Sequence, residues 1–297
     1  MKILISGAGG LVGTALAPHL SGQGHAVRRL ARSNPSGEDI LWNPEQKTID
    51  AAKLEGFEGV VHLAGESIAS GRWTEERKKR IRDSRVLGTR FLVEALGRLA
   101  QRPKIFLCAS AIGFYGDRGD EVLREESPPG SLFLSQVCRD WEEAAAQAAS
   151  SGMRVVRLRF GMILSAHGGA LAKMLLPFRL GLGGKIGSGA QYMSWVSIED
   201  TVGAIAHALN AESLRGPVNV VAPNPVSNLE FTKTLGKVLG RPTVFPMPAF
   251  AARLAFGQMA DELLLASARV QPAKLASGGY HFKHPQLEGA LRDLLPS

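Results

Sequence analysis

Short hydrophobic runs, each bounded by glycine or charged residues, alternate along residues 1–222 with longer segments in which hydrophobic residues recur every three or four positions. The short runs predict buried strands, and the longer segments predict amphipathic helices. Strands are predicted at residues 2–7, 26–31, 59–65, 104–110, 153–160 and 217–222, and helices at 11–20, 74–99, 132–149 and 198–210. Because strands that alternate with helices pair in parallel, the pattern predicts an α/β fold with helices on both faces of a parallel sheet.

The pattern changes after Ala222. Two prolines and two asparagines at 221–228 predict a turn and a helix cap, and helical periodicity continues through 229–240 and 250–266. We therefore expect a main domain at residues 1–225 and a small, mostly helical domain at 226–297 that binds a substrate or a partner. The glycine-rich segment 179–191 predicts an irregular loop over a ligand cleft. Pro18 is expected to kink or shorten the first helix.

Composition restricts the expected cellular location of the protein and the expected classes of partner. The 297 residues contain no apolar run long enough to cross a bilayer, no basic leader at the start and only two cysteines, Cys108 and Cys138, which together predict a cytoplasmic protein. The net charge of +8 raises nucleic acid as a partner. The densest basic stretch, Arg72–Arg85, is interrupted by three carboxylates, as in a solvated helix face. We therefore expect neither nucleic acid nor a membrane as a partner, and no metal site.

The stretch ISGAGGLVG at residues 5–13 joins the first predicted strand to the first helix. Gly7, Gly10 and Gly13 are spaced three apart. Such glycines permit a tight turn, a close approach of the backbone to a pyrophosphate, and close packing of helix on strand. The helix N-terminus then offers unpaired N–H groups to the anion. This context of strand, turn and helix predicts a dinucleotide site, whereas three glycines alone would indicate only a turn.

The end of the second strand indicates which dinucleotide is bound. NAD sites place a carboxylate there to hold the ribose hydroxyls, but this strand ends in Ala31, Arg32 and Ser33. An arginine at that point suits a 2′-phosphate, because its guanidinium donates two parallel hydrogen bonds to phosphate oxygens. The sequence therefore predicts NADP(H) rather than NAD, with a surface arginine as the alternative interpretation.

Longer motifs resemble a known family. GAGGLVG, HLAGE (62–66), SRVLGT (84–89) and SAIGFYG (110–116) follow one another as in extended short-chain dehydrogenases/reductases. The segments AGESIASGRWTEERKKRIRDSR, LLPFRLGLGGKIGSGAQ and VAPNPVSNLEFTKTLGKVLGRP resemble the epimerase-family proteins of the atypical group. RVQPAKLASGGYHFKHPQLEGALRDLL (269–295) resembles the C-terminal domain of unknown function that those proteins carry. Over essentially the whole chain, the resemblance implies a Rossmann-type doubly wound parallel sheet that binds NADP(H).

The resemblance also implies roles for individual residues. Gly7, Gly10, Leu11, Val12 and Gly13 would meet the pyrophosphate, Ala31, Arg32 and Ser33 the adenosine phosphate, and Leu63, Ala64, Gly65 and Glu66 the adenine and ribose. Arg85 stands where extended relatives usually have asparagine and would reach the cofactor from the central helix. The alternative for Arg85 is an ion pair with Asp83 or Glu66.

The usual catalytic pair is missing. Such reductases use a tyrosine and a lysine four residues later on one helix face, where the lysine charge lowers the tyrosine pKa. By alignment, Leu134 takes the tyrosine position and Cys138 the lysine position. Ser110 remains as the candidate catalytic residue, which could polarise a carbonyl, or else it is a plain turn serine. A serine alone has no base to activate it.

Two functions remain open on these grounds. The chain is either an NADP(H)-dependent oxidoreductase or epimerase acting on a small substrate of unassigned identity, or a non-catalytic NADPH-binding sensor or structural protein. The glycine-rich segment 179–191 favours the first. The missing tyrosine and lysine favour the second. The sequence leaves the oligomeric state open.

Overall fold

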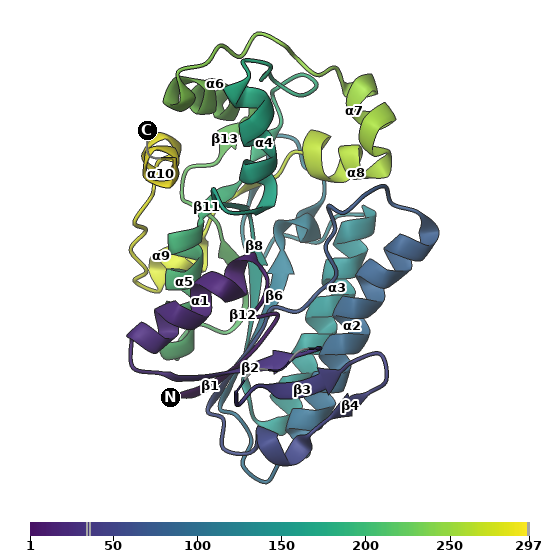
Figure 1. The fold of residues 1–297 in the computed structure, drawn as a ribbon, viewed down its shortest axis with the longest axis vertical. Coiled ribbons are helices and arrows are strands. Elements are labelled where there is room, and N and C mark those ends of the chain that lie inside the picture. The colour runs from purple at the N-terminus through teal and green to yellow at the C-terminus, as the bar shows by residue number, and fades with distance from the viewer. Residues whose placement is uncertain (34, 36, 296–297) are drawn as a thin grey trace.

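A single large parallel sheet forms the centre of the molecule (Figure 1). The computed structural model describes residues 1–33, 35 and 37–295. The strands lie in the order β12-β8-β6-β5-β1-β2-β3-β4, and all neighbouring pairs are parallel except β3 with β4. Their bounds are β1 (Lys2–Ser6), β2 (Ala26–Ala31), β3 (Ile40–Asn43), β4 (Thr48–Ile49), β5 (Gly59–His62), β6 (Ile105–Ala111), β8 (Arg154–Phe160) and β12 (Gly216–Val220).

Helices cover both faces of this sheet (Figure 1). Helices α1 (Leu11–Gly22) and α5 (Ile198–Asn210) contact each other on one face, and α2 (Glu75–Gly97) and α3 (Phe133–Ala146) contact each other on the other. Strands β1 and β5 are buried almost throughout, as expected for central strands that are covered on both sides. The predicted α/β fold with a Rossmann-type doubly wound sheet is confirmed.

The chain leaves β1 toward β2 on one side and later returns to β5 on the other. Strand order therefore reverses between β1 and β5. In open parallel sheets, ligands bind at such a reversal, in the crevice beyond the carboxyl ends of the strands.

A second group of elements, which we call the cap, packs at the carboxyl ends of the sheet (upper part of Figure 1). Its helices are α4 (Gly169–Arg179), α6 (Asn228–Leu239), α7 (Ala249–Phe256), α8 (Gln258–Ala260) and α10 (Leu287–Leu294). Its own core joins residues from before and after position 225, among them Leu175, Trp195, Phe231 and Leu291. The boundary at residue 225 stays a prediction.

Short strand pairs and one further helix link the cap to the sheet. β9 (Met162–Leu164) pairs with β11 (Trp195–Ser197), β10 (Tyr192–Met193) with β13 (Val226–Ser227), and β7 (Val122–Leu123) with β14 (Arg269–Val270). Helix α9 (Ala273–Ser277) packs on β12. None of the helices among the described residues combines the length and the apolar character needed to cross a membrane.

Two local predictions differ from the structure, and some elements of the structure were not predicted. Helix α1 runs past Pro18 to Gly22, because Pro18 is exposed and water can reach the carbonyl that loses its N–H partner. The predicted helix 250–266 divides at Gly257, whose φ of +62° suits glycine, and continues as α8 and a π-helical turn, Asp261–Leu265. Strand β3 and helix α4 were not predicted.

Candidate functional site

The three spaced glycines form a compact turn between β1 and α1. Gly7 has a φ of +71°, and a Cβ on it would lie 2.7 Å from the carbonyl carbon of Leu63. A Cβ on Gly13 would lie 2.4 Å from the carbonyl oxygen of Gly7, so only glycine lets the helix pack this close to the strand. Gly10 has open space in front of it apart from that same oxygen, 3.3 Å from a built Cβ.

The N-terminus of α1 is open to an anion. No side chain caps it, and its first turn contains no acidic residue. The N–H groups of the first helical residues, among them Leu11 and Val12, have no acceptor within the helix, and the positive end of the helix dipole lies at the same point. These observations fit a pyrophosphate, since the backbone can come close and the N–H groups are free to donate.

The loop after β5 lies directly beside this turn. A Cβ on Gly7 would also come within 2.8 Å of the backbone nitrogen of Ala64, so Leu63 and Ala64 line the turn. Gly65 lies under the Arg85 guanidinium, whose carbon is 3.2 Å from a built Cβ. The structure therefore brings together at one edge residues that are about 60 to 80 positions apart in the chain.

Arg85 is held by backbone groups instead of a carboxylate. It donates hydrogen bonds to the carbonyls of Glu66 at 2.9 Å and Ile81 at 3.1 Å, and it stacks over the Trp141 ring. Burial lowers its pKa. The side chain of Glu66 instead pairs with Arg77, and Asp83 pairs with Lys79, so neither ion pair considered for Arg85 forms. Arg85 holds the loop at Gly65 in place and keeps its charge next to the crevice.

A buried histidine that the sequence analysis did not single out fixes this edge. His62, at the end of β5, lies 2.6 Å from the Ser6 hydroxyl and 3.0 Å from the Thr89 hydroxyl, which also accepts a hydrogen bond from Trp141. Complete burial lowers the pKa of His62 to about 4, so the ring is neutral at pH 7. The only sign in the sequence is a histidine within the otherwise apolar run GVVHLAG.

At the end of β2, Arg32 is exposed and lines a small polar hollow with Ser33, Asn43, Pro44 and Glu45. Ala31 is the last residue of the strand. The interactions of the described residues give Arg32 no carboxylate partner.

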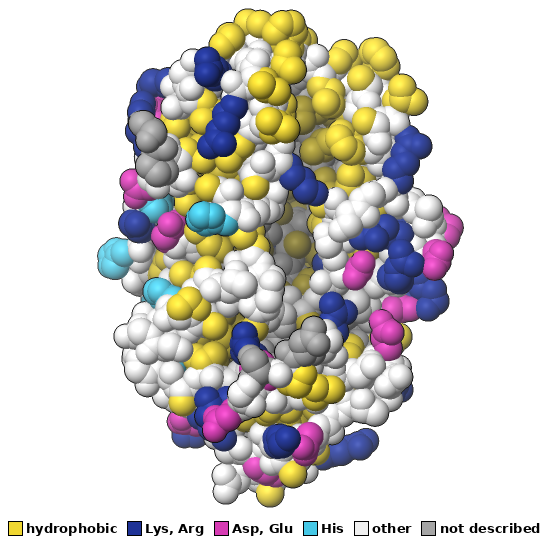
Figure 2. Space-filling model, in the orientation of Figure 1, with side chains coloured by type: hydrophobic (Ala, Val, Ile, Leu, Met, Phe, Trp, Pro, Cys, Tyr) yellow, Lys and Arg dark blue, Asp and Glu magenta, His cyan; other side chains and the backbone are white. Residues whose placement is uncertain are grey.

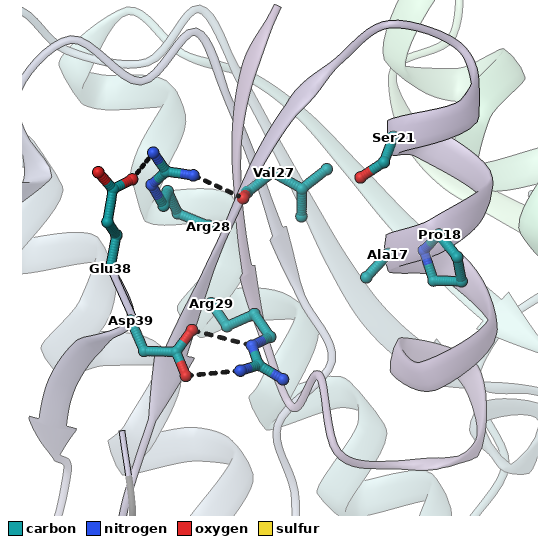
Figure 3. A pocket seen from close by; sticks show the side chains of 8 residues that line it. All are labelled: Ala17, Pro18, Ser21, Val27, Arg28, Arg29, Glu38 and Asp39. Atoms are coloured by element: carbon teal, nitrogen blue, oxygen red, sulfur yellow. Dashed lines mark hydrogen bonds and ion pairs between the residues drawn. The ribbon is translucent and has the colours of Figure 1, made fainter. Parts of the chain in front are cut away.

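The two arginines within β2, unlike Arg32, each have a carboxylate partner among the described residues. Arg28 pairs with Glu38, and Arg29 donates two hydrogen bonds to Asp39, around a separate hollow between α1 and β2 (Figure 3). That hollow lies beside the C-terminal half of α1, away from the glycine turn. Arg32, which directly follows the strand, is thus the arginine that remains available to an anion.

Ser110, near the end of β6, belongs to a buried cluster. Its side chain is 3% exposed and its hydroxyl donates to Glu142 at 2.8 Å. Arg159 donates to both carboxylate oxygens of Glu142, at 2.7 and 2.9 Å, and to the Tyr115 hydroxyl at 2.9 Å. Burial favours loss of the Arg159 proton, but the hydrogen bonds and charge of Glu142 outweigh it and raise the pKa. Burial also raises the pKa of Tyr115 to about 12.

This cluster bears on the catalytic prediction. The hydroxyl proton of Ser110 is already used in a bond to a carboxylate that itself neutralises Arg159. The catalytic role of Ser110 stays a prediction, and the geometry supplies a clear structural role for its hydroxyl.

Leu134 and Cys138 both lie buried on α3, facing the end of β6. A Cβ on Gly113 would lie 3.3 Å from the Cβ of Leu134. Burial, assisted by the nearby charge of Glu142, raises the pKa of Cys138 to about 11, which leaves the thiol protonated and unreactive at pH 7. Among the residues that the structure describes, no cluster of three His, Cys, Asp or Glu side chains could hold a metal ion.

The cap reaches the first turn of α3. Glu262, in the π-helical turn, accepts hydrogen bonds from the backbone nitrogens of Phe133 at 3.2 Å and Leu134 at 2.8 Å. Gln258 of α8 donates to the same carboxylate at 2.8 Å. The carboxylate satisfies N–H groups that no side chain of α3 itself caps, and it fixes the cap against the helix that carries the tyrosine in related reductases.

Comparison with known proteins assigns the family. The model of the NAD dependent epimerase/dehydratase family matches residues 3–221, and a model of a domain of unknown function matches residues 247–294. An epimerase family protein of Mycobacterium leprae is 40% identical over 290 residues, which cover 97% of this chain and 94% of the relative.

Two solved structures support the same family assignment. The crystal structure of the human epimerase family protein SDR39U1 with NADPH has a TM-score of 0.92 and 35% identity, and the match covers 99% of each chain. The nucleoside-diphosphate sugar epimerase of Corynebacterium glutamicum has a TM-score of 0.82 and 38% identity, over 98% of this chain and 57% of that chain. The resemblance read from the motifs is confirmed, and the chain belongs to the NAD dependent epimerase/dehydratase family.

Proposed function

We propose that this chain binds NADP(H) and acts as an oxidoreductase or epimerase on a small substrate. The observation that carries the cofactor is Arg32, an arginine without a carboxylate partner among the described residues, at the end of β2 where NAD-binding sheets place an acid. The NADPH in the human relative's structure supports the same choice. A cytoplasmic location remains part of the proposal.

Each end of the cofactor has a place in this arrangement. Arg32 and Ser33 would hold the 2′-phosphate, and the turn Gly7–Gly13 with the α1 N-terminus would hold the pyrophosphate. Leu63 and Ala64 would line the adenosine side. When bound, NADP(H) supplies a hydride acceptor or donor. The residues of the chain bind and orient it, and the buried surroundings of Leu134 exclude water from the reacting end.

A second function, a cofactor-binding protein without turnover, is favoured by one specific observation. Leu134 and Cys138 replace the groups that would exchange a proton, and the nearby Ser110 hydroxyl is committed to Glu142. On either function the partner is a small molecule, and neither nucleic acid nor a membrane is needed.

The cofactor proposal is tested by titrating the purified chain with NADPH and with NADH and following nucleotide fluorescence. For Arg32→Ala, we expect the Kd for NADPH to rise about tenfold to hundredfold, since charge-assisted hydrogen bonds to phosphate are lost, while NADH binding stays unchanged. Arg28→Ala is the matched control, because Arg28 lies four residues earlier, within β2, but pairs with Glu38. Equal NADPH affinity of Arg32→Ala and the unmodified chain would contradict the assignment.

Turnover is tested separately. The NADPH-loaded chain is mixed with a panel of aldehydes and ketones, and loss of nucleotide absorbance is followed. Oxidation by any member of the panel supports the enzyme. Tight NADPH binding with no oxidation across the panel supports the sensor.

A further inference from the structure

Exposed apolar side chains gather on the cap. Thirteen large hydrophobic residues are exposed among those that the structure describes, and ten of them fall between positions 176 and 263. The ten are Leu176, Leu180, Leu182, Leu229, Val244, Phe245, Met247, Phe250, Leu254 and Leu263. Scattered surface leucines are ordinary, but so strong a concentration on one part of a molecule marks a binding surface.

A hollow lies between helices that carry some of these side chains. Figure 2 shows a deep hollow with hydrophobic side chains on both sides, and Figure 1 places α4 on one side of it and α7 with α8 on the other. Each side has a pair of exposed residues one helical turn apart, Leu176 with Leu180 on α4, or just after it, and Phe250 with Leu254 on α7.

One segment of the chain joins the two sides of the hollow. Residues 67–73 cross between the two sides, because Lys173 of α4 donates to the Ala69 carbonyl at 2.9 Å and Arg72 donates to the Leu254 carbonyl of α7. Trp73, at the end of this crossing, packs edge-on against Phe133, with ring centres 5.5 Å apart. Phe133 and Leu134 begin α3. Segment 67–73 therefore connects both sides of the hollow with the start of α3.

The charge of these segments is mainly positive. Segments 169–189 and 228–263 contain seven basic residues and three acidic ones, Glu230, Asp261 and Glu262. Arg179 and Arg241 are exposed, and the contacts of the described residues give neither a carboxylate partner. The segments that carry them meet, since a Cβ on Gly181 would be 3.8 Å from Pro242. Exposed apolar side chains on the same segments as these two cations suit a ligand that is apolar along its length and anionic at one end.

We propose that the hollow between α4 and α7–α8 binds a single elongated amphiphile, an apolar chain that bears one acidic group. The chain lies against the leucine and phenylalanine side chains of the two helices, and the acid lies near Arg179 and Arg241. Naming this amphiphile as the substrate class rests on the proposed function, whereas the binding site itself does not.

The test uses dodecanoate, kept below its micelle concentration, in calorimetric titration of the full chain. We expect saturable binding of one molecule per chain. The double variant Leu176→Asn with Leu254→Asn should weaken binding at least about tenfold, because two apolar contacts are lost. Both positions are well exposed, at 68% and 75%, so the variant should fold, which circular dichroism checks. Leu87→Asn, at an exposed leucine of α2, is the control.

A second set of variants tests how much the two arginines contribute to binding of the acidic group. Arg179→Gln with Arg241→Gln should weaken dodecanoate binding about tenfold and leave dodecanol binding unchanged, since the alcohol has no charge to lose. Arg90→Gln, at an exposed arginine of α2, is the control.

Three results would overturn the proposal. These are no saturable dodecanoate binding, equal affinity of the leucine double variant, and binding only to phosphatidylglycerol vesicles, which would make the patch a membrane surface. NADPH is titrated into the same samples. If the chain binds NADPH but not dodecanoate, only the amphiphile proposal is rejected. If the unmodified chain does not bind NADPH, the proposed function is rejected.

Discussion

The carboxyl edge of the sheet and the cap meet at the same crevice but are built in opposite ways. At the sheet edge, buried polar groups are paired with one another, as His62 is with Ser6 and Thr89, and Glu142 with Ser110 and Arg159. On the cap, apolar side chains such as Leu254 and Phe250 are exposed. The sheet edge is therefore complete before any ligand arrives, whereas the cap leaves apolar surface that a ligand can cover.

This difference predicts that substitutions in the two regions affect different properties of the protein. A substitution at the sheet edge disturbs packed neighbours and should lower the free energy of unfolding. A substitution at the exposed leucines of the cap should change ligand affinity and leave stability nearly unchanged. The following changes test that division, beginning with the largest expected effect.

Replacing Glu142 with leucine should destabilise the protein most. The change leaves Arg159, 3% exposed, as a buried cation without its carboxylate. Breaking a buried pair by removing one partner costs about 3–5 kcal/mol. Urea unfolding measures the loss. Glu143→Leu, at an exposed neighbouring position on the same helix, is the control, and similar unfolding midpoints for the two variants would show that the buried cluster is dispensable.

Acidic pH should lower the free energy of unfolding, because the unfolded chain binds a proton at His62 more readily than the folded chain does. Its pKa is about 4 in the folded chain and 6.5 unperturbed, so between these values the unfolded chain binds the additional proton. Stability from the neutral ring is fully present above pH 6.5 and is lost as the pH falls toward 4, by up to about 3 kcal/mol.

Urea unfolding at a series of pH values measures this dependence. His62→Gln removes the titrating ring, so the variant should be less stable at neutral pH but should show a shallower fall between pH 6.5 and 4. If both proteins lose stability with the same slope, the acid dependence arises elsewhere in the molecule.

Gly13→Ala should destabilise the sheet edge by about 1–3 kcal/mol, because the new methyl group would overlap the Gly7 carbonyl and the helix must move. NADPH affinity should fall with it, since the displaced turn is the one proposed to hold the pyrophosphate. Gly22→Ala, in the same helix, has no atom within 4 Å of its Cβ and should be neutral or slightly stabilising. Thermal unfolding and nucleotide titration of the pair measure both effects.

Leu254→Asn should have the smallest effect on stability, within about 0.5 kcal/mol, because its side chain is 75% exposed in the folded chain. Thermal unfolding checks this value. A loss above 1 kcal/mol, which would indicate a packed core position, would remove the distinction drawn between the cap and the sheet edge.

The sequence alone determined the architecture and the position of the glycine turn after the first strand. Local period decides strand or helix, so the six predicted strands and the first four helices appear within a few residues of their predicted ends. The roles of Gly10 and Gly13 could also be predicted from the sequence, because their constraints act between neighbours in the chain, whereas the contact of Gly7 with Leu63 could not. The strands β3 and β4 and helix α4 escaped prediction, since the strands are short and the helix contains a proline.

Only the tertiary structure decided which side chains meet. No local pattern indicates that Ser110 donates to a carboxylate 32 residues later, that His62 joins Ser6 to Thr89, or that Glu262 of the cap satisfies the first turn of α3. These contacts join segments far apart in the chain, and the energy that favours them exists only after the sheet has formed. The same holds for the exposed leucines of α4 and α7, whose places on either side of one hollow follow from packing alone.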